Sequence, residues 1–358
     1  VWMIAKSPVA ITDAIDSRTV GGGGVFVHFD KISEKSAQVY VETEIQNDNT
    51  RSESVTIETT LTDAEGNVIK RTSGKLSLNS GEKKSIRQQM EVRNPKLWSP
   101  DAPYLYRVQS RIKKGNRSID GGTTRIGIRL AEFRGKEGFW LNGKPFGQLV
   151  GANRHQDFAY VGNALPNSQQ WRDAKRLRDA GCTIIRVAHY PQDPSFMDAC
   201  DELGLFVIVA TPGWQYWNKD PKFGELVHQN TREMIRRDRN HPSIFCWSIG
   251  NEVIERKKLE VVTTARKLAD YVHKFDPSRP VTSALAAWDN DWEIYDPLAA
   301  VHEIVGYNYL LHRASVDHQR VPSRVIMQTE SYPRDVFANW SLAVSYTHLR
   351  AHETEADL

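Results

Sequence analysis

The 358-residue sequence predicts an antiparallel, immunoglobulin-like β-sandwich followed by an incomplete (β/α)8 TIM barrel. Up to about residue 130 the chain has short runs of alternating apolar and polar side chains separated by polar turns, which is typical of a sandwich. From about residue 139 apolar runs alternate with helical patterns, which indicates parallel strands joined by right-handed crossovers. Polar residues at the ends of many of these runs favour a barrel over the alternative, a doubly wound sheet.

The sandwich is assigned to residues 24–128. Alternate residues from Val39 to Ile45 are suited to one buried face, and those from Val55 to Leu61 repeat the pattern. A turn rich in Asp, Gly and Asn at 63–67 then leads into the next strand. The run Tyr104–Tyr106 is expected to lie in the core.

The barrel is assigned to residues 135–340, where only seven strands can be counted. The strands are expected at 148–152, 183–188, 205–209, 243–249, 281–284, 304–307 and 325–327, and the helices at 168–180, 194–203, 222–239 and 256–275. Residues 341–358 are too few for the last helix, strand and helix of such a barrel. They resemble translated adapter sequence, so we expect this tail to be foreign to the fold. With its eighth strand missing, the chain on its own is expected to be nearly inactive.

Composition excludes several classes of partner. Lys and Arg number 47 against 44 Asp and Glu, and the basic residues are scattered, so nucleic acid is not expected. No apolar run is long enough to span a bilayer. Cys182, Cys200 and Cys246 lack metal-ligand spacing and have the apolar contexts of reduced core residues. None of this fixes the compartment, and both the bacterial cytoplasm and the periplasm stay open.

Two glutamates carry the strongest chemical signal. Glu252 follows the apolar run that begins at Ser243, and Glu330 follows a similar run that begins at Arg324. Carboxylates at two strand ends around one barrel mouth suit glycosidic bond cleavage, in which one protonates the leaving oxygen and the other attacks the anomeric carbon. Asn251, directly before Glu252, has an amide that can hold a sugar hydroxyl.

Other side chains at strand ends have two interpretations each. His155 and His189 follow the first two barrel strands and either donate hydrogen bonds to sugar hydroxyls or cap their strands. Trp214 and Trp288 follow the third and fifth strands and either stack on a sugar face or anchor their loops.

Several separate motifs resemble glycoside hydrolase family two, which includes β-galactosidases, β-glucuronidases and β-mannosidases. They are found, in order, at 94–106, 127–129, 139–145, 153–157, 186–191, 247–252 and 329–331. The resemblance covers nearly everything before the tail. It implies that residues 1–15 are the end of an N-terminal sugar-binding β-domain.

The resemblance also implies roles for individual residues. Glu252 would be the acid/base and Glu330 the nucleophile of a retaining double displacement through a covalent glycosyl-enzyme. Tyr309 would hydrogen-bond the nucleophile, with Tyr307 as the alternative if the register differs. Arg154 would contact ligand, or orient Glu330 or a neighbouring loop by ion pairing.

The resemblance favours a β-galactosidase acting on a β-glycoside or oligosaccharide, with β-glucuronidase and β-mannosidase as alternatives within the family. A non-catalytic carbohydrate-binding protein on the same fold is the rival class. Residues 210–213 lack the acidic residue that many relatives carry after strand three, which leaves substrate specificity open. No cofactor is expected to be required; Mg²⁺ or Na⁺ would be implied only by likeness to some galactosidases. A homo-oligomer is open for the full-length protein.

Overall fold

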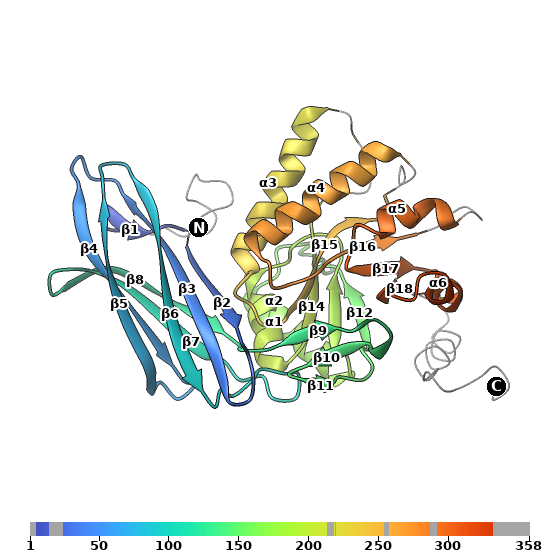
Figure 1. Cartoon of the computed structure of the whole chain (residues 1–358), viewed down its shortest axis with the longest axis horizontal. Helices are drawn as coiled ribbons and strands as arrows, with labels where there is room; N and C mark the ends of the chain where they lie inside the picture. Colours follow the sequence, from blue (N-terminus) through green and yellow to red (C-terminus); the bar gives the residue numbers. More distant parts are fainter. Residues whose placement is uncertain are drawn as a thin grey trace. The chain divides into compact units, whose positions relative to one another are not determined.

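The computed structural model describes residues 5–13, 24–212, 218, 220–253, 258–286 and 292–331 (Figure 1). The chain divides into two compact units. The first comprises residues 1–130, 194–205 and 232–244, and the second comprises 131–193, 206–231 and 245–358. The tail at 341–358 lies outside the described residues.

The first unit contains a sandwich of two antiparallel sheets. Its strands are β1 (Val9–Ile11), β2 (Val25–Asp30), β3 (Ser36–Asn47), β4 (Glu53–Thr62), β5 (Val68–Leu78), β6 (Lys83–Arg93), β7 (Tyr106–Lys114) and β8 (Arg117–Ile126). In one sheet β6 pairs with β3 along one edge, and β1 and β2 share the other edge. The second sheet has the order β5-β4-β7-β8.

The two faces predicted to be apolar do form the sandwich core. Every second residue of β3 from Val39 to Ile45 is buried, as is every second residue of β4 from Val55 to Leu61. Tyr106 is buried as expected, whereas Tyr104 is half-buried and its hydroxyl reaches Glu65.

Strand β1 corrects one expectation about the start of the chain. The resemblance assigns residues 1–15 to a preceding domain. In the structure, β1 pairs with β3 in the register Val9–Asn47, and Val9 and Ile11 pack into the sandwich core. These residues therefore belong to the sandwich sheet, because Val9 and Ile11 are buried against the other apolar side chains of its core.

Two segments from later in the chain belong to the same unit: helix α2 (Pro194–Leu203) and residues 232–244. The indole of Trp98 donates to the carbonyl of Asp201 at 2.9 Å. The amide of Asn240 donates to the carbonyl of Val25 at 2.8 Å and accepts from the N–H of Val27 at 2.9 Å. Asn240 thus satisfies backbone groups of β2 as a paired strand would.

The second unit contains the seven predicted parallel strands, paired in chain order. They are β12 (Gly151–Arg154), β13 (Ile184–Val187), β14 (Phe206–Ala210), β15 (Ile244–Asn251), β16 (Val281–Leu285), β17 (Ile304–Asn308) and β18 (Ile326–Glu330). A small antiparallel sheet of β9 (Ala131–Phe133), β10 (Phe139–Leu141) and β11 (Lys144–Pro145) precedes them. Within the part of the chain that the structure describes, the order ends at β12 and β18, in agreement with an incomplete barrel.

Helices cover the parallel strands (Figure 1). They are α1 (Asn167–Asp179), α3 (Pro221–Asp238), α4 (Leu259–Phe275), α5 (Asp296–Ala299) and α6 (Ala314–Arg320), with short 3-10 turns η1 (Gly135–Glu137), η2 (Trp292–Tyr295) and η3 (Leu311–Arg313). Helix α4 buries Val261, Ala265, Leu268 and Val272, the stripe expected of a helix lying on a sheet. Among the described helices, none combines the length and apolar character needed to cross a bilayer.

Aromatic side chains fill the end of the parallel sheet where the strands begin. Phe206 and Phe245 stand near the starts of β14 and β15, and Phe139 from β10 packs against both, with ring centroids 5.6 and 4.9 Å away. This end is therefore occupied by packed rings. The polar residues of the strands gather at the opposite, carboxyl end.

Candidate active site

Two strands each contain one extra residue close to a glutamate. Strand β15 shifts its register against β16 between Ser248 and Asn251, directly before Glu252. Strand β18 shifts against β17 by one residue, Thr329, before Glu330. Such β-bulges bend a strand and re-aim the side chains that follow, and they are frequent beside active sites.

Two residues at these strand ends adopt left-handed backbone conformations. Glu252 has φ of +46° and Tyr309 has φ of +58°. A residue with a side chain is costly to hold there, by on the order of 1–3 kcal/mol, and such strain collects at functional sites. The N–H of Glu252 donates to the carbonyl of Ala284 at 2.8 Å, and that of Tyr309 to Glu330 at 2.9 Å, so neighbouring strands hold both residues in place.

Glu330 is held by two donors, one on each carboxylate oxygen. Arg186 donates to Oε1 at 2.6 Å, and the hydroxyl of Tyr309 donates to Oε2 at 2.7 Å. Only 3% of the Arg186 side chain and 13% of the Glu330 side chain are exposed. Charge-assisted hydrogen bonds in such a dry environment are strong and directional.

These contacts set the protonation of the pair. Burial by itself would raise the pKa of Glu330, but the hydrogen bond from Tyr309 and the charge of Arg186 outweigh it and lower that pKa. The same hydrogen bond raises the pKa of Tyr309 to about 12, so the phenol keeps its proton at neutral pH. Glu330 is therefore an ionised carboxylate, the form that a nucleophile needs.

A chain of hydrogen bonds joins the two glutamates. From Glu330 it runs through Arg186, whose Nη2 donates to Oδ1 of Asn251 at 2.7 Å. Nδ2 of Asn308 donates to the same Oδ1 at 3.4 Å and to Oε1 of Glu252 at 3.0 Å. Residues from four strand ends thus meet in one network, as expected for the carboxyl edge of a parallel sheet.

The two predicted histidines lie side by side next to this network. The rings of His155 and His189 meet edge to face, with centroids 5.5 Å apart. Nε2 of His189 is 3.9 Å from Oε1 of Glu330, and Nδ1 is 3.3 Å from Arg186. Burial, with Arg186 and His155 nearby, lowers the pKa of His189 to about 4. His189 is therefore neutral near pH 7.

Arg154 contacts residues of helix α1 rather than Glu330. Its guanidinium pairs with Asp173 at 2.7 Å and with Gln170 at 2.8 Å, both on α1, and also bonds Gln192. The cation beside Glu330 is Arg186, so the expectation that Arg154 orients Glu330 is corrected, whereas its bond to Gln192 agrees with the alternative that it orients a neighbouring loop. Side chains alternate along a strand, and Arg186 pairs with Asn153 rather than with Arg154, so the two arginines face opposite sides of the sheet.

The two candidate tyrosines also separate. Tyr309 reaches Glu330 in the arrangement that the resemblance implies. Tyr307 is fully buried, and its hydroxyl donates to Asp317 on α6 at 3.0 Å. Tyr307 therefore belongs to the packing of helix on sheet. Trp214 and Trp288 lie outside the described residues.

Sequence reasoning missed two residues of the network, Arg186 and Asn308, and also Thr329, whose hydroxyl donates to Oδ1 of Asn308 at 2.7 Å. The first two had a signal, because each is a polar side chain inside an apolar strand and must find a partner when buried. Thr329 carried no comparable signal. Its part depends on the bulge, which the sequence pattern does not reveal.

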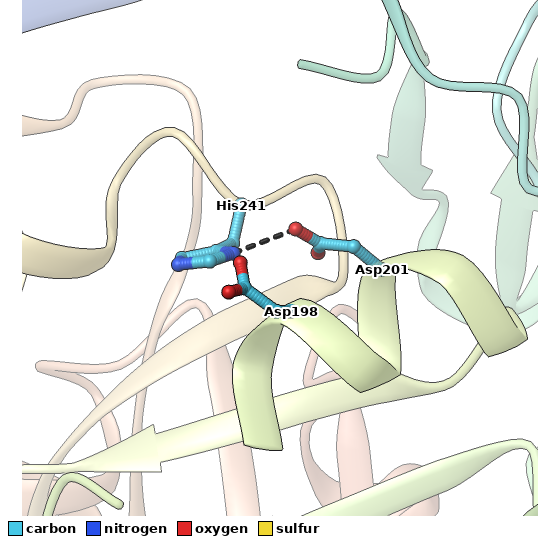
Figure 2. A group of neighbouring side chains, drawn as sticks. All are labelled: Asp198, Asp201 and His241. Carbon is cyan, nitrogen blue, oxygen red and sulfur yellow. Dashed lines mark hydrogen bonds and ion pairs between the residues drawn. The ribbon is translucent and has the colours of Figure 1, made fainter. Parts of the chain in front are cut away.

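The first unit holds a separate group of ionisable side chains, Asp198, Asp201 and His241 (Figure 2). Nδ1 of His241 is 2.6 Å from Oδ2 of Asp201, the N–H of Ser243 donates to Oδ1 of Asp201 at 3.1 Å, and Arg125 pairs with Asp198 at 2.5 Å. Burial alone would lower the pKa of His241, but the Asp201 carboxylate outweighs it and raises that pKa. The carboxylates are thus engaged by protein cations and donors, so the group is a structural ion-pair cluster.

Comparison with known proteins places both units in one family. Residues 132–354 match the family described as "Glycosyl hydrolases family 2, TIM barrel domain", and residues 23–129 match "Glycosyl hydrolases family 2". A curated β-galactosidase from Thermoanaerobacter pseudethanolicus is 36% identical over 275 residues, which cover 75% of this chain and 35% of that protein.

Solved structures of glycoside hydrolases also superpose on this chain. A glycosyl hydrolase family 2 member from Bacteroides cellulosilyticus superposes with a TM-score of 0.85 at 30% identity, covering 95% of this chain and 44% of that one. A β-glucuronidase from Bacteroides uniformis, covalently bound to cyclophellitol-6-carboxylate aziridine, gives 0.81 at 28% identity, covering 89% of this chain and 40% of that one. The chain thus spans less than half the length of each of these proteins.

Proposed function

The chain belongs to glycosyl hydrolase family 2, and we propose that the full-length protein containing it hydrolyses β-glycosides with retention of configuration. The observation that carries the proposal is the network joining Glu252 and Glu330 through Arg186, Asn251 and Asn308. Two carboxylates at strand ends, one of them held ionised by a buried cation, suit a nucleophile and an acid/base.

In the first step the Glu330 carboxylate attacks the anomeric carbon. The bond from that carbon to the glycosidic oxygen breaks, and the leaving oxygen takes the proton of Glu252. The products are an ester between Glu330 and the sugar, the released alcohol, and an ionised Glu252. Asn251 would hold a sugar hydroxyl, and His155 and His189 would donate to others.

In the second step water replaces the alcohol. Glu252 takes a proton from the water while the water oxygen attacks the anomeric carbon. The bond between that carbon and Glu330 breaks, and its electron pair returns to the carboxylate. Tyr309 and Arg186 stabilise the charge that reappears on Glu330. The sugar leaves with its original configuration, and both glutamates regain their starting protonation.

Within this reaction class we propose a β-galactoside as the substrate. The relatives include both a β-galactosidase and a β-glucuronidase. A glucuronide carries a carboxylate that favours a free cation in its site. Among the described residues of the network, Arg186 is already paired with Glu330, and His189 is neutral near pH 7. This balance favours an uncharged sugar.

The test uses the full-length protein and a panel of nitrophenyl β-galactoside, β-glucuronide, β-mannoside and β-glucoside. We expect the galactoside to have the largest kcat/KM and to be hydrolysed with retention, and we expect chelators to leave the rate unchanged. Preference for the glucuronide would correct the sugar while keeping the mechanism. Binding without hydrolysis would reject the enzyme in favour of a carbohydrate-binding protein.

Two variants test the roles. Glu330→Gln should abolish turnover. Glu252→Gln should spare the first step for activated aryl glycosides, because a good leaving group needs little protonation. Equal losses on every leaving group would mean that the roles are assigned wrongly.

A further inference from the structure

One hydrogen bond next to Glu330 determines the orientation of an amide on the neighbouring strand. Oγ1 of Thr329, the bulge residue of β18, donates to Oδ1 of Asn308 at 2.7 Å. Thr329 is 7% exposed and Asn308 is 1% exposed. In a site this dry an amide keeps the orientation that satisfies both of its ends. With its oxygen facing Thr329, Asn308 presents its NH₂ group on the other side.

That NH₂ group faces the second glutamate. Nδ2 of Asn308 donates to Oε1 of Glu252 at 3.0 Å and lies 3.4 Å from Oδ1 of Asn251. An amide flipped by 180° would place an oxygen against both of these acceptors. The hydroxyl of Thr329 thus prevents an arrangement in which oxygen would face oxygen.

Glu252 depends on this contact. Its left-handed backbone, with φ of +46°, takes it out of the regular course of β15, and its side chain is only half-buried. The hydrogen bond from Nδ2 of Asn308 therefore orients a carboxyl group that the strand itself does not orient.

We propose that Thr329 on β18 and Asn308 on β17 are positioning residues that hold Glu252 in place from the side of the opposite glutamate. This inference rests on the function proposed above, with Glu252 as the acid/base and Glu330 as the nucleophile. Thr329 acts through Asn308 and contacts no reacting atom. Its hydroxyl couples the geometry of the two carboxyl groups, because it belongs to the residue directly before Glu330.

The consequence appears in the dependence on the leaving group. A misplaced acid slows departure of a poor leaving group and leaves departure of a good one nearly unaffected. The value of kcat/KM reports the first step, so its change should be larger for a substrate with a poor leaving group than for one with a good leaving group. Removing the Thr329 hydroxyl leaves the buried Oδ1 of Asn308 without this donor, and leaving a buried acceptor unsatisfied corresponds to roughly 10- to 100-fold.

The experiment compares variants of the full-length protein on a dinitrophenyl glycoside and on a methyl glycoside of the sugar that the wild type prefers. Thr329→Val keeps the shape and removes the hydroxyl, Thr329→Ser restores it, and Asn308→Asp replaces the donor by an acceptor. Thr282→Val is the matched control, since its buried hydroxyl on β16 has no hydrogen-bond partner among the described residues.

We expect Thr329→Val to lower kcat/KM for the methyl glycoside by roughly 10- to 100-fold and for the dinitrophenyl glycoside by less than about threefold. Thr329→Ser should recover most of the loss, Asn308→Asp should exceed it, and Thr282→Val should match the wild type on both substrates.

Two outcomes would overturn the inference: equal loss on both substrates in Thr329→Val, or no loss on either. Thermal unfolding of each variant identifies one that fails to fold. If Thr329→Val does, Asn308→Asp decides, because removal of the donor to Glu252 must lower kcat/KM more for the methyl glycoside than for the dinitrophenyl glycoside. If the wild type itself hydrolyses neither glycoside, the proposed function fails, which is distinct from a failure of the positioning role.

Discussion

The guanidinium of Arg186 donates from Nη1 to Oε1 of Glu330 at 2.6 Å, although 144 positions separate the two residues in the sequence. Both side chains are largely shielded from water, so the cation acts on the carboxylate with little screening. Nη2 of the same arginine bonds Asn251, next to the other glutamate. One buried arginine therefore stabilises the ionised form of Glu330 and also holds the amide of Asn251, the residue next to Glu252.

Replacing Arg186 by Gln should move the acidic limb of the rate profile to higher pH. The pKa of Glu330 is lowered in part by Arg186, and Glu330 must be ionised to attack. Without the cation that pKa rises, so activity is lost at a higher pH on acidification. The measurement is kcat/KM for an aryl glycoside between pH 3 and 8, where the Gln variant should also be slower throughout.

Arg154→Gln is the matched control for Arg186→Gln. Arg154 is an equally buried arginine whose ion pair is with Asp173 on α1. Its loss should lower thermal stability while the acidic limb stays in place. A limb that moves in the Arg154 variant and not in the Arg186 variant would contradict the assignment of the two arginines.

Tyr309→Phe should reduce activity, whereas Tyr307→Phe should reduce stability. The hydroxyl of Tyr309 donates to Glu330, and losing a hydrogen bond to a charged group costs about 1.5–3 kcal/mol, or roughly 10- to 100-fold in rate. The hydroxyl of Tyr307 donates to buried Asp317, so its loss should lower the free energy of unfolding by about 1–3 kcal/mol. Steady-state kinetics and urea unfolding of both variants separate these effects; the reverse pattern would exchange the two roles.

The carboxyl groups of Glu252 and Glu330 should lie about 5–5.5 Å apart in a crystal structure of the full-length protein, the separation of retaining glycosidases. Inverting enzymes need room for a water between the groups and hold them roughly 6.5–9.5 Å apart. A separation near the upper value would reject the covalent intermediate. The anomer released first, followed by NMR, provides an independent check.

The His241–Asp201 pair should make stability fall as pH rises. The folded-state pKa of His241 is raised, so its stabilising contribution is complete below the unfolded value of about 6.5 and is lost as pH rises through the folded value. Urea unfolding between pH 6.5 and 9 measures this slope. His241→Gln should flatten it and cost about 3–5 kcal/mol at low pH by leaving a buried carboxylate without its cation.

Another histidine gives a weaker slope of the same sign. The hydrogen bond to Glu303 raises the pKa of His273, so a shallow fall should remain in His241→Gln. His302, whose pKa burial lowers to about 4, acts in the opposite sense and loses stability below pH 6.5. A slope above pH 6.5 that is unchanged in His241→Gln would mean that the imidazole is not charged in the folded protein.

Local pattern was sufficient for the main strands of the sandwich and for the seven parallel strands, although it did not predict β9, α5 or α6. The period of two in β3 and β4 follows from the geometry of a strand with one face buried, and it held at every predicted position. The continuous apolar run of β15 follows from burial on both faces, and Gly181 ends α1 with φ of +90°, as a C-terminal cap requires. These features depend on residues near one another in the chain.

The local pattern did not predict which later segments of the chain bond to the sandwich. The alternating runs assign the sandwich to residues 24–128, whereas Asn240 completes the backbone hydrogen bonding of β2. A lone Asn in a helix-to-strand connection carries no sign of this contact, which depends on the packing of segments more than 200 positions apart.

The placement of the strand-end residues shows the limit most clearly. The motif at 186–191 and the two glutamates could be located from the sequence, yet the choice between Arg154 and Arg186 required the register of β12 against β13. The two arginines fall on opposite faces, and which face becomes the interior depends on how the whole sheet curves and on where the helices pack.

Tyr307 and Tyr309 pose the same problem at the end of β17. A period of two would put both on one face, so no local pattern can separate them. The left-handed backbone at Tyr309 breaks the period and turns that side chain toward Glu330, while Tyr307 stays in the regular strand and meets α6. The sequence by itself determined which residue types stand at the strand ends. The tertiary structure alone decided where they point, because bulges and left-handed residues are stabilised by partners from distant strands.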